Sequence, residues 1–478
     1  MKKEGYITVY LSLTFVIMLS LIFTLLEGIR MQTIRFQTEC VMDFGLTSIF
    51  AEYNREFLEQ YGLLAIDTSY GYEDAGMERT KSHFLQYMNM NFTAPGQNRV
   101  PGYKDLTALH ADNAGFSKVS YISDGKGEVL KYQIIQYMKE KTALSYAEKY
   151  LPDVDFGKKG TEYSELEAKR ESSHGIINEI LNELNAKRKE DEDEISIDNP
   201  ADYVNGMRNS ALLDWVVSDS TSISRNAVNL STYISHRQYQ EGAGLWSNQE
   251  KPDGMINRVF LQKYLFDKCG YYLEKKENSI LNYQLEYLLY GKNNDYENVE
   301  LLAKQLFQIR YVVNAAYLFG SGVRQAEASE LAAVVTSGIL SPELYEAVKI
   351  TILFAWCYAE TVQDLRILFD GKKVAEVKND ADWNTPLSEL LAFTSTLDSY
   401  NEASNGKTYR DYLEMLLFIK EEEAVRMRLM DIMEMDIGYT AGNQNFKLDQ
   451  CVYQLEADAN VTSKYGYGYS ITRQYSYE

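Results

Sequence analysis

The chain has 478 residues and a formal net charge of −21, with 24% charged and 45% apolar residues. An acidic surplus of this size disfavours binding to nucleic acid or to anionic lipid, because both are themselves negatively charged. The apolar fraction is that of an ordinary globular protein and excludes wholesale disorder. The length allows two or three domains beyond any membrane anchor.

The first predicted element is a membrane-spanning helix. Residues 5–26 contain no Asp, Glu, Lys or Arg, and at about 1.5 Å per residue they cover the roughly 30 Å hydrocarbon core. A cleaved signal peptide and a buried core helix are the alternatives. Glu27-Gly28-Ile29-Arg30 follows the run directly, where a signal peptide has small residues for cleavage. We therefore expect a retained single-pass anchor, with a cytoplasmic N-terminus and the chain beyond Glu27 exported.

Beyond the span the apolar pattern becomes one-sided. Apolar residues recur every three or four positions from Leu46 to Leu64, which predicts that the helix continues as an amphipathic rod and that residues 1–64 form one segment. Gly62 is typical of a helix end, and residues 63–66 have the pattern of a short buried strand. The rod side chains expected to contact other proteins are Phe50, Tyr53, Phe57 and Tyr61.

Residues 65–125 are predicted to form the first part of a small α+β platform. The runs Leu106–Ala111 and Phe116–Ile122 resemble strands, and Ser82–Met88 resembles a short helix. Asp124-Gly125-Lys126-Gly127 has the composition of a turn.

Residues 126–200 are predicted to be charged helices with an acidic linker, and residues 157–200 are the most polar part of the chain. A helix is expected from Glu128 to Tyr150, and a charged surface helix around Ile176 to Leu184. The acidic run at 189–194 lacks a glycine-centred loop, so it indicates a solvated linker rather than a calcium site.

Residues 201–438 are predicted to form a helical domain, because apolar residues at helical spacing alternate with glycine breakers. The clearest predicted helices are Arg258–Cys269, Leu281–Tyr290, Val299–Phe319, Ala326–Ser337, Pro342–Phe369 and Tyr409–Met435.

Residues 439–478 change to strand spacing. Apolar and polar residues alternate from Cys451 to Val461, Ser463-Lys464 has the look of a turn, and tyrosines alternate again up to Tyr477. This pattern predicts an antiparallel hairpin, which needs a partner surface because a lone hairpin is marginally stable. The strand-like residues between 63 and 122 are the natural partner. The region between them is then an insertion.

The predicted fold class is therefore α+β and predominantly α. It comprises an N-terminal transmembrane helix that continues into an exported amphipathic helix, a small pilin-like sheet closed by the C-terminal hairpin, and a large helical insertion.

Two polar groups within the helical domain are candidate structural or functional residues. Trp356, Glu360 and Asp364 lie four residues apart and share one helix face, and Arg310 and Asn314 share a face of an earlier helix. A functional acidic pair is one interpretation. The other is an internal bracket in which Arg310 pairs with Glu360 or Asp364, since buried charges require partners.

No catalytic, cofactor-binding or metal-binding motif is recognisable, and we expect a protein that is not an enzyme and uses no cofactor. The four histidines are far apart and form no HExxH pattern. Four cysteines permit two disulfides in an exported protein, but their apolar settings favour free structural thiols.

Several motifs resemble an uncharacterised membrane-anchored family of Gram-positive bacteria. They are Gly5-Tyr6-Ile7-Thr8-Val9-Tyr10-Leu11-Ser12-Leu13, Leu26-Glu27-Gly28-Ile29-Arg30, Glu52-Tyr53-Asn54-Arg55, Tyr61-Gly62-Leu63-Leu64-Ala65, Glu286-Tyr287-Leu288-Leu289-Tyr290-Gly291, Arg310-Tyr311-Val312-Val313-Asn314 and Trp356 through Asp364.

That family is associated with tight-adherence (Tad, Flp-type) pilus loci and is similar to the minor pseudopilins TadE and TadG. The resemblance implies a role in pilus assembly or surface display, with other pilus or secretion subunits and membrane lipid as partners. A type IV prepilin has Glu at the fifth mature position, where this chain has Tyr10 after Gly5. This departure argues for retention in the membrane. A membrane-anchored adhesin or ligand-binding ectodomain is the alternative.

Overall fold

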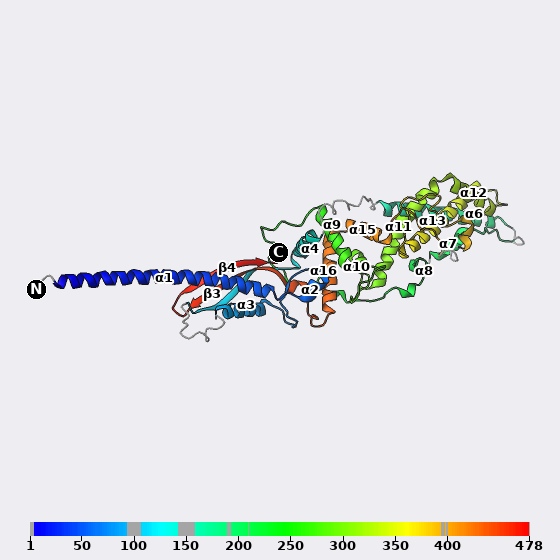
Figure 1. Cartoon of the computed structure of the whole chain (residues 1–478). Helices are drawn as coiled ribbons and strands as arrows, with labels where there is room; N and C mark the ends of the chain where they lie inside the picture. The colour runs from blue at the N-terminus through cyan, green and yellow to red at the C-terminus, as the bar shows by residue number, and fades with distance from the viewer. Residues whose placement is uncertain are drawn as a thin grey trace. The chain divides into compact units, whose positions relative to one another are not determined.

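The computed structural model describes residues 4–92, 107–141, 158–188, 193–208, 210–392, 397 and 400–477. The chain divides into two compact units. Unit 1 consists of Met1–Ala143, Ser231–Leu261 and Leu429–Glu478, and unit 2 of Leu144–Leu230 and Gln262–Arg428. The described residues are mainly helical, with a small antiparallel sheet in unit 1 (Figure 1).

Unit 1 begins with the long helix α1 (Glu4–Phe50). The helix passes through Gly28 and Gly45 without a break. At Gly45 the reason for glycine is contact: an added Cβ would lie 2.9 Å from the ring of Phe84 on α3 (Met77–Phe92). The glycine therefore lets α3 approach α1 closely.

The predicted continuous rod is wrong, because the helix stops at Phe50 and a separate short helix follows. The peptide N–H of Asn54 donates to Ala65 O at 3.0 Å, and the Asn54 side chain caps the new helix by accepting from the N–H of Phe57 at 3.0 Å. Helix α2 (Arg55–Tyr61) then ends at Gly62, which has φ +70°, as predicted for a helix stop. The bond from Asn54 to Ala65, which lies beyond the rod, thus accompanies its division into two helices.

The sheet joins the two ends of the sequence. Its long strand β3 (Cys451–Ser463) pairs antiparallel with β2 (Leu109–Tyr121) along one edge, and with β4 (Gly468–Ser476) and the two-residue β1 (Ile66–Asp67) along the other. The prediction that the C-terminal hairpin pairs with strands between 63 and 122 is confirmed. The two strand-like runs predicted there are one strand with register shifts.

A predicted turn also folds part of unit 1 onto the end of β2. Gly125, Lys126 and Gly127 all have positive φ at the beginning of α4 (Asp124–Lys141). The carboxylate of Asp124 accepts the peptide N–H groups of Gly242 at 2.7 Å and Gly244 at 2.9 Å. The end of the helix predicted for 128–150 lies outside the described residues.

Unit 2 is built around α13 (Pro342–Phe369), whose side chains from Thr351 to Phe369 are all buried. Ser341 caps this helix and Pro342 occupies its first turn, which are the start signals that the sequence shows. The helices packed against it are α6 (Lys159–Ala186), α7 (Pro200–Met207), α8 (Leu212–Val216), α11 (Asp295–Gly320) and α12 (Gly322–Val335).

The remaining elements connect these parts. They are the helices α9 (Met255–Lys268), α10 (Gln284–Tyr290), α15 (Tyr409–Ile419) and α16 (Glu422–Gly438), and the 3₁₀ turns η2 (Ser220–Ser222), η3 (Leu230–Thr232), η4 (Leu387–Ala392) and η5 (Leu448–Gln450). The single helix predicted for Tyr409–Met435 is wrong, because Lys420 takes an extended conformation and ends α15. A capping box at Thr408 and Asp411 begins that helix.

Candidate functional site

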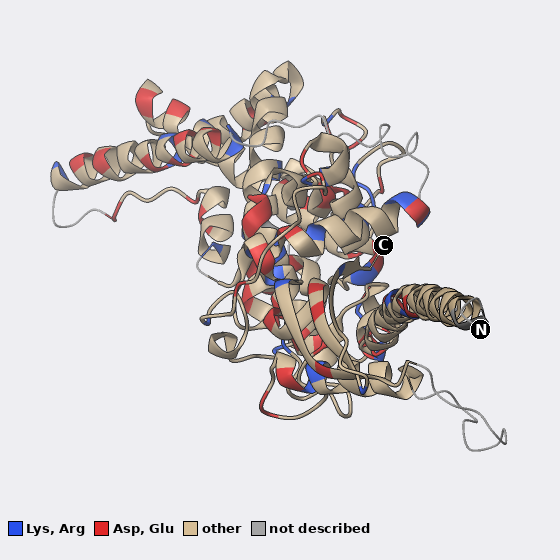
Figure 2. Ribbon diagram, turned by 90° about the vertical axis from the view of Figure 1, so that its left-hand side faces the viewer, with Lys and Arg blue, Asp and Glu red and all other residues tan. Residues whose placement is uncertain are grey.

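Helix α1 changes its environment along its length. It is long and apolar enough to cross a membrane, and its most apolar window has no side chain buried against the rest of the protein. Figure 2 shows the stretch next to the N-terminus in tan, because residues 5–26 carry no Lys, Arg, Asp or Glu. Burial begins at Ile34. One helix thus joins a membrane-compatible segment to the folded part of unit 1.

The charged part of α1 lies along β4 and the turn that precedes it. The guanidinium of Arg30 stacks 3.7 Å from the ring centroid of Tyr465, and Arg35 lies 5.8 Å from that of Tyr469. Further along, Arg473 Nε lies 3.5 Å from Asp43 Oδ1. Alternate residues of a strand point to the same face. The tyrosines predicted in the hairpin therefore contact α1 in the order of the sequence, with Tyr465 near Arg30 and Tyr469 near Arg35.

The end of α1 is fixed by the last residues of the sheet region. The ring of Phe50 lies 4.6 Å from that of Tyr475 and 4.8 Å from that of Tyr477. The Tyr477 hydroxyl donates to the carbonyl oxygen of Phe50 at 2.6 Å. This bond satisfies one of the helix-end carbonyls that have no partner within the helix.

The predicted interaction residues of the rod do not form a surface. Phe50, Phe57 and Tyr61 are buried within unit 1, and only Tyr53, at 36% exposure, reaches solvent. Phe57 packs 5.8 Å from the ring of Phe446. The role assigned to these three side chains from the sequence is therefore corrected: they hold unit 1 together.

A group of buried carboxylates lies in unit 1, and one of them contacts the last residue of α2. The Tyr61 hydroxyl donates to Asp436 at 2.6 Å. Arg237 donates to Glu434 and to Asp449 at 2.7 Å each. Burial raises the pKa of Glu434 to about 7, although Arg237 lowers it. The guanidinium of Arg237 is thus shared between two carboxylates.

The polar residues predicted in unit 2 come together as an internal bracket. Arg310 donates to Asp364 Oδ2 through Nε at 3.0 Å and through Nη2 at 2.9 Å, and Asn314 donates to the same oxygen at 2.9 Å. Trp356 donates its indole N–H to the carbonyl of Thr385 at 2.7 Å. Of the two carboxylates weighed from the sequence, Arg310 contacts Asp364.

Glu360 belongs to the same cluster but has a different cation. Lys378 Nζ lies 2.6 Å from Glu360 Oε1 and 2.6 Å from Asp364 Oδ1, and the peptide N–H groups of Asn384 and Thr385 also donate to Glu360. Burial acts to raise the pKa of Asp364, but Arg310 and Lys378 together hold it below its ordinary value. The cluster is charge-balanced, and its charged groups are engaged with one another.

A second buried acid of unit 2, Glu286, has no ion pair with a cation among the described residues. Glu286 accepts from the Tyr409 hydroxyl at 2.5 Å and from the Tyr272 N–H at 2.9 Å, and its Oε2 has no hydrogen-bond partner. Burial raises its pKa to about 7, against those two hydrogen bonds. The sequence pattern did not indicate the roles of Arg237 and Glu434, whose partners lie about two hundred residues away in the chain, or those of Glu286 and Lys378, whose contacts include residues of irregular segments.

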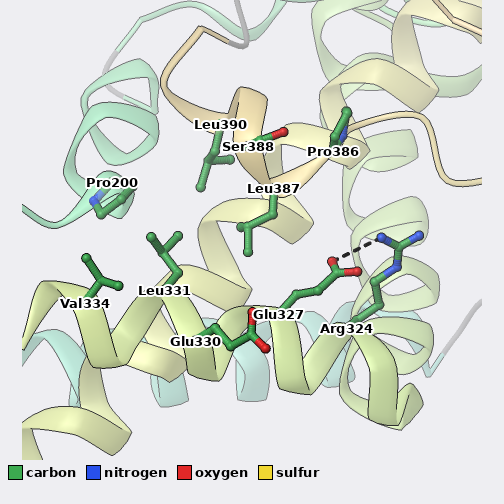
Figure 3. Close-up of a pocket in the computed structure, with 10 residues that line it drawn as sticks. All are labelled: Pro200, Arg324, Glu327, Glu330, Leu331, Val334, Pro386, Leu387, Ser388 and Leu390. Atoms are coloured by element: carbon green, nitrogen blue, oxygen red, sulfur yellow. Dashed lines mark hydrogen bonds and ion pairs between the residues drawn. The ribbon is translucent and has the colours of Figure 1, made fainter.

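One concavity within unit 2 is a groove of about 560 Å³ beside α12 (Figure 3). Leu331, Val334, Leu387 and Leu390 give it apolar walls, and Glu327 pairs with Arg324 at one end. Among the described residues, no group of three His, Cys, Asp or Glu is placed to hold a metal ion. The four cysteines are free thiols, and all but Cys40 are buried.

No curated protein matches the chain, and no solved structure matches it. A model of a family of unknown function, DUF5702, matches residues 189–463. The match begins after α6 and ends at the last residue of β3, so it includes the balanced cluster, Arg237 and the central strand of the sheet. Since it covers more than half of the sequence, the chain belongs to the family DUF5702.

Proposed function

We propose that this protein is a structural or assembly component, similar to a pseudopilin, of a Tad-type pilus or secretion apparatus. In this proposal residues 5–26 of α1 anchor it as a single-pass membrane protein with a cytoplasmic N-terminus, and both units lie outside the cell. Its partners are membrane lipid and other subunits of the apparatus. Nucleic acid is not among them, given the net charge of −21.

The observation that carries this proposal is the continuity of α1. The same helix contains an apolar stretch with no internal contacts and a later stretch that is packed on α3 and β4. A flexible linker would let the outer units move independently of the anchor. A continuous helix instead fixes the position and orientation of the sheet relative to the membrane. A subunit of an assembly requires such a fixed orientation, whereas an enzyme that is only tethered to a membrane does not.

Photo-crosslinking in intact cells tests this role. Tyr53 lies between α1 and α2 and is the exposed one of the four predicted interaction residues. A photoreactive residue in its place is expected to capture other subunits of the apparatus. The control places the same residue at Val377, which is 78% exposed in unit 2. Capture only of lipid or of the protein itself at position 53, or the same captured proteins at both positions, contradicts the proposal. Protease added to intact cells checks the orientation, since both units should be degraded.

One observation favours the second candidate, a membrane-anchored adhesin or ligand-binding ectodomain. The groove beside α12 has apolar walls and a volume of about 560 Å³, which lies in the range of small-molecule and peptide sites. Replacing Leu331 by Asp should then abolish surface adhesion and leave pilus assembly intact, whereas Val377→Asp should change neither. Loss of assembly with Leu331→Asp, in a variant that folds, contradicts the adhesin role.

A further inference from the structure

Helix α1 has a second apolar stripe outside the span, which the described residues of unit 1 do not bury. Ile29 is 64% exposed, Phe36 is 70% exposed and Phe44 is 60% exposed. At about 100° per residue these three positions, with Thr33 and Cys40 between them, fall within an arc of about 80°. We call the five residues the outer seam.

The outer seam lies on the side of α1 that faces away from the rest of unit 1. The buried residues of this stretch include Ile34, Thr38, Val41, Gly45 and Ile49, and the same helical geometry places them on the opposite side. Isolated exposed apolar residues are common on protein surfaces. Here three large apolar residues are aligned on one face of α1, and the opposite face is already buried. Such an aligned apolar surface is typical of a protein contact.

The charged residues near the outer seam are engaged elsewhere. Arg30 and Arg35 lie over tyrosines of the hairpin, and Glu39 and Asp43 lie 4.0 and 3.5 Å from Arg473. No seam residue is charged, and the seam positions are three or four residues apart, as in the contact line of paired helices. Asp43 borders the seam, but Arg473 lies 3.5 Å from it and offsets its charge, which reduces repulsion between two identical seams.

We propose that two copies of this chain pair in parallel along the outer seam from Ile29 to Phe44. A membrane anchor holds α1 of every copy in the same direction and at the same depth, so each seam residue meets its own counterpart. A parallel pair related by a two-fold axis is closed and self-complementary. The proposal rests on the part of the proposed function that places residues 5–26 in a membrane, and it is independent of the apparatus.

Cys40 makes this pairing measurable. It lies in the outer seam and is partly exposed, whereas Cys269, Cys357 and Cys451 are at most 7% exposed. In the proposed pair the two Cys40 side chains face each other, and a disulfide forms where two Cα atoms are about 4.4–6.8 Å apart. Mild oxidation of the full chain in membranes should give a reducible dimer on a non-reducing gel, and Cys40→Ser should abolish it.

Moving the cysteine separates specific pairing from random collision. In the Cys40→Ser background, Phe36→Cys restores a cysteine within the outer seam. Met31→Cys places one on the opposite side of α1, where the residue is 44% exposed. Dimer from position 36 at least about tenfold above that from position 31 is expected. Equal yields, no dimer from positions 36 and 40, or a disulfide to a different protein overturn the pairing.

A variant without engineered cysteines provides the second measurement. Phe36→Asp places a charge in the outer seam at an exposed position, so unit 1 should keep its far-UV circular dichroism while the particle mass in detergent falls from dimer to monomer. A dimer that persists overturns the proposal. Capture of other subunits at Tyr53 reports on the proposed function separately, because Tyr53 lies outside α1.

Discussion

The two units bury acidic groups in opposite ways. In unit 2, two carboxylates face two cations, and the pKa of Asp364 falls below its ordinary value although the group is completely buried. In unit 1, Arg237 is shared between two carboxylates, Glu434 and Asp449, and burial raises the pKa of Glu434 to about 7. Burial penalises the ionised form in both places. The local balance of charge, and not depth, decides the direction of the shift.

The largest expected effect tests the balanced cluster. Arg310→Ala should lower the free energy of unfolding of unit 2 by about 3–5 kcal/mol, because it leaves buried Asp364 with one cation in place of two. Denaturant unfolding in detergent, followed by tryptophan fluorescence, measures the loss. The control is Lys304→Ala, since Lys304 pairs with Glu300 on an exposed helix face and should change stability by less than about 0.5 kcal/mol. If both substitutions changed the free energy of unfolding equally, Arg310 would have no special structural role.

Arg237→Ala should cost about 3 kcal/mol in unit 1 near pH 8 and less near pH 5. Without the cation the folded pKa of Glu434 rises further, while the unfolded value stays ordinary. The stability contributed by protonated Glu434 is then complete below the unfolded pKa and is lost as the pH rises through the folded one. Unfolding midpoints measured from pH 5 to pH 8 check the trend. A loss of stability that does not vary with pH would show that Arg237 does not influence the titration of Glu434.

Glu286 sharpens the comparison, because it lies in unit 2 and forms no ion pair within the part of the chain that the structure describes. Its pKa of about 7 means that the parent protein loses stability as the pH rises from about 4.5 through 7, by about 3 kcal/mol. Glu286→Gln cannot ionise, so the unfolding midpoint of unit 2 should depend less on pH. Asp364→Asn is the contrast, since that substitution removes a carboxylate whose pKa is lowered. If Glu286→Gln leaves the pH profile unchanged, Glu286 does not titrate in this range.

The smallest expected change in stability concerns a surface ion pair of unit 1. Arg473 lies 3.5 Å from Asp43 and 4.0 Å from Glu39 at the surface, and its side chain is 41% exposed. Arg473→Ala should change the stability of unit 1 by less than about 1 kcal/mol, and 0.5 M NaCl should reduce that difference. A larger, salt-independent loss in thermal unfolding would show that the pair also fixes α1 on β4.

Features that depend on local pattern were predictable from the sequence. Ser341 and Pro342 mark the beginning of α13, Gly62 ends α2, and the alternation after Cys451 identifies the hairpin. The shared face of Arg310 and Asn314 also follows from helical spacing, which is why an internal bracket could be proposed at all.

Features that depend on distant residues were not predictable in this way. The rod is divided at Asn54 because that residue bonds to Ala65, and nothing in the apolar spacing signals the break. Lys378 lies in an irregular segment without periodicity, and Arg237 reaches a carboxylate more than two hundred residues away. Such contacts are fixed by tertiary structure, so composition and periodicity carry no trace of them.

The central position of β3 has a consequence for the order in which the protein forms. Strands β1 and β2 are made early, yet the strand that joins them is synthesised after nearly all of unit 2. During synthesis the inner face of α1 and the edges of β1 and β2 must therefore wait, exposed, while hundreds of residues follow. A nascent chain that stops before residue 451 never covers these surfaces. The C-terminal hairpin is therefore the last part of unit 1 to be made and the part that covers these strand edges.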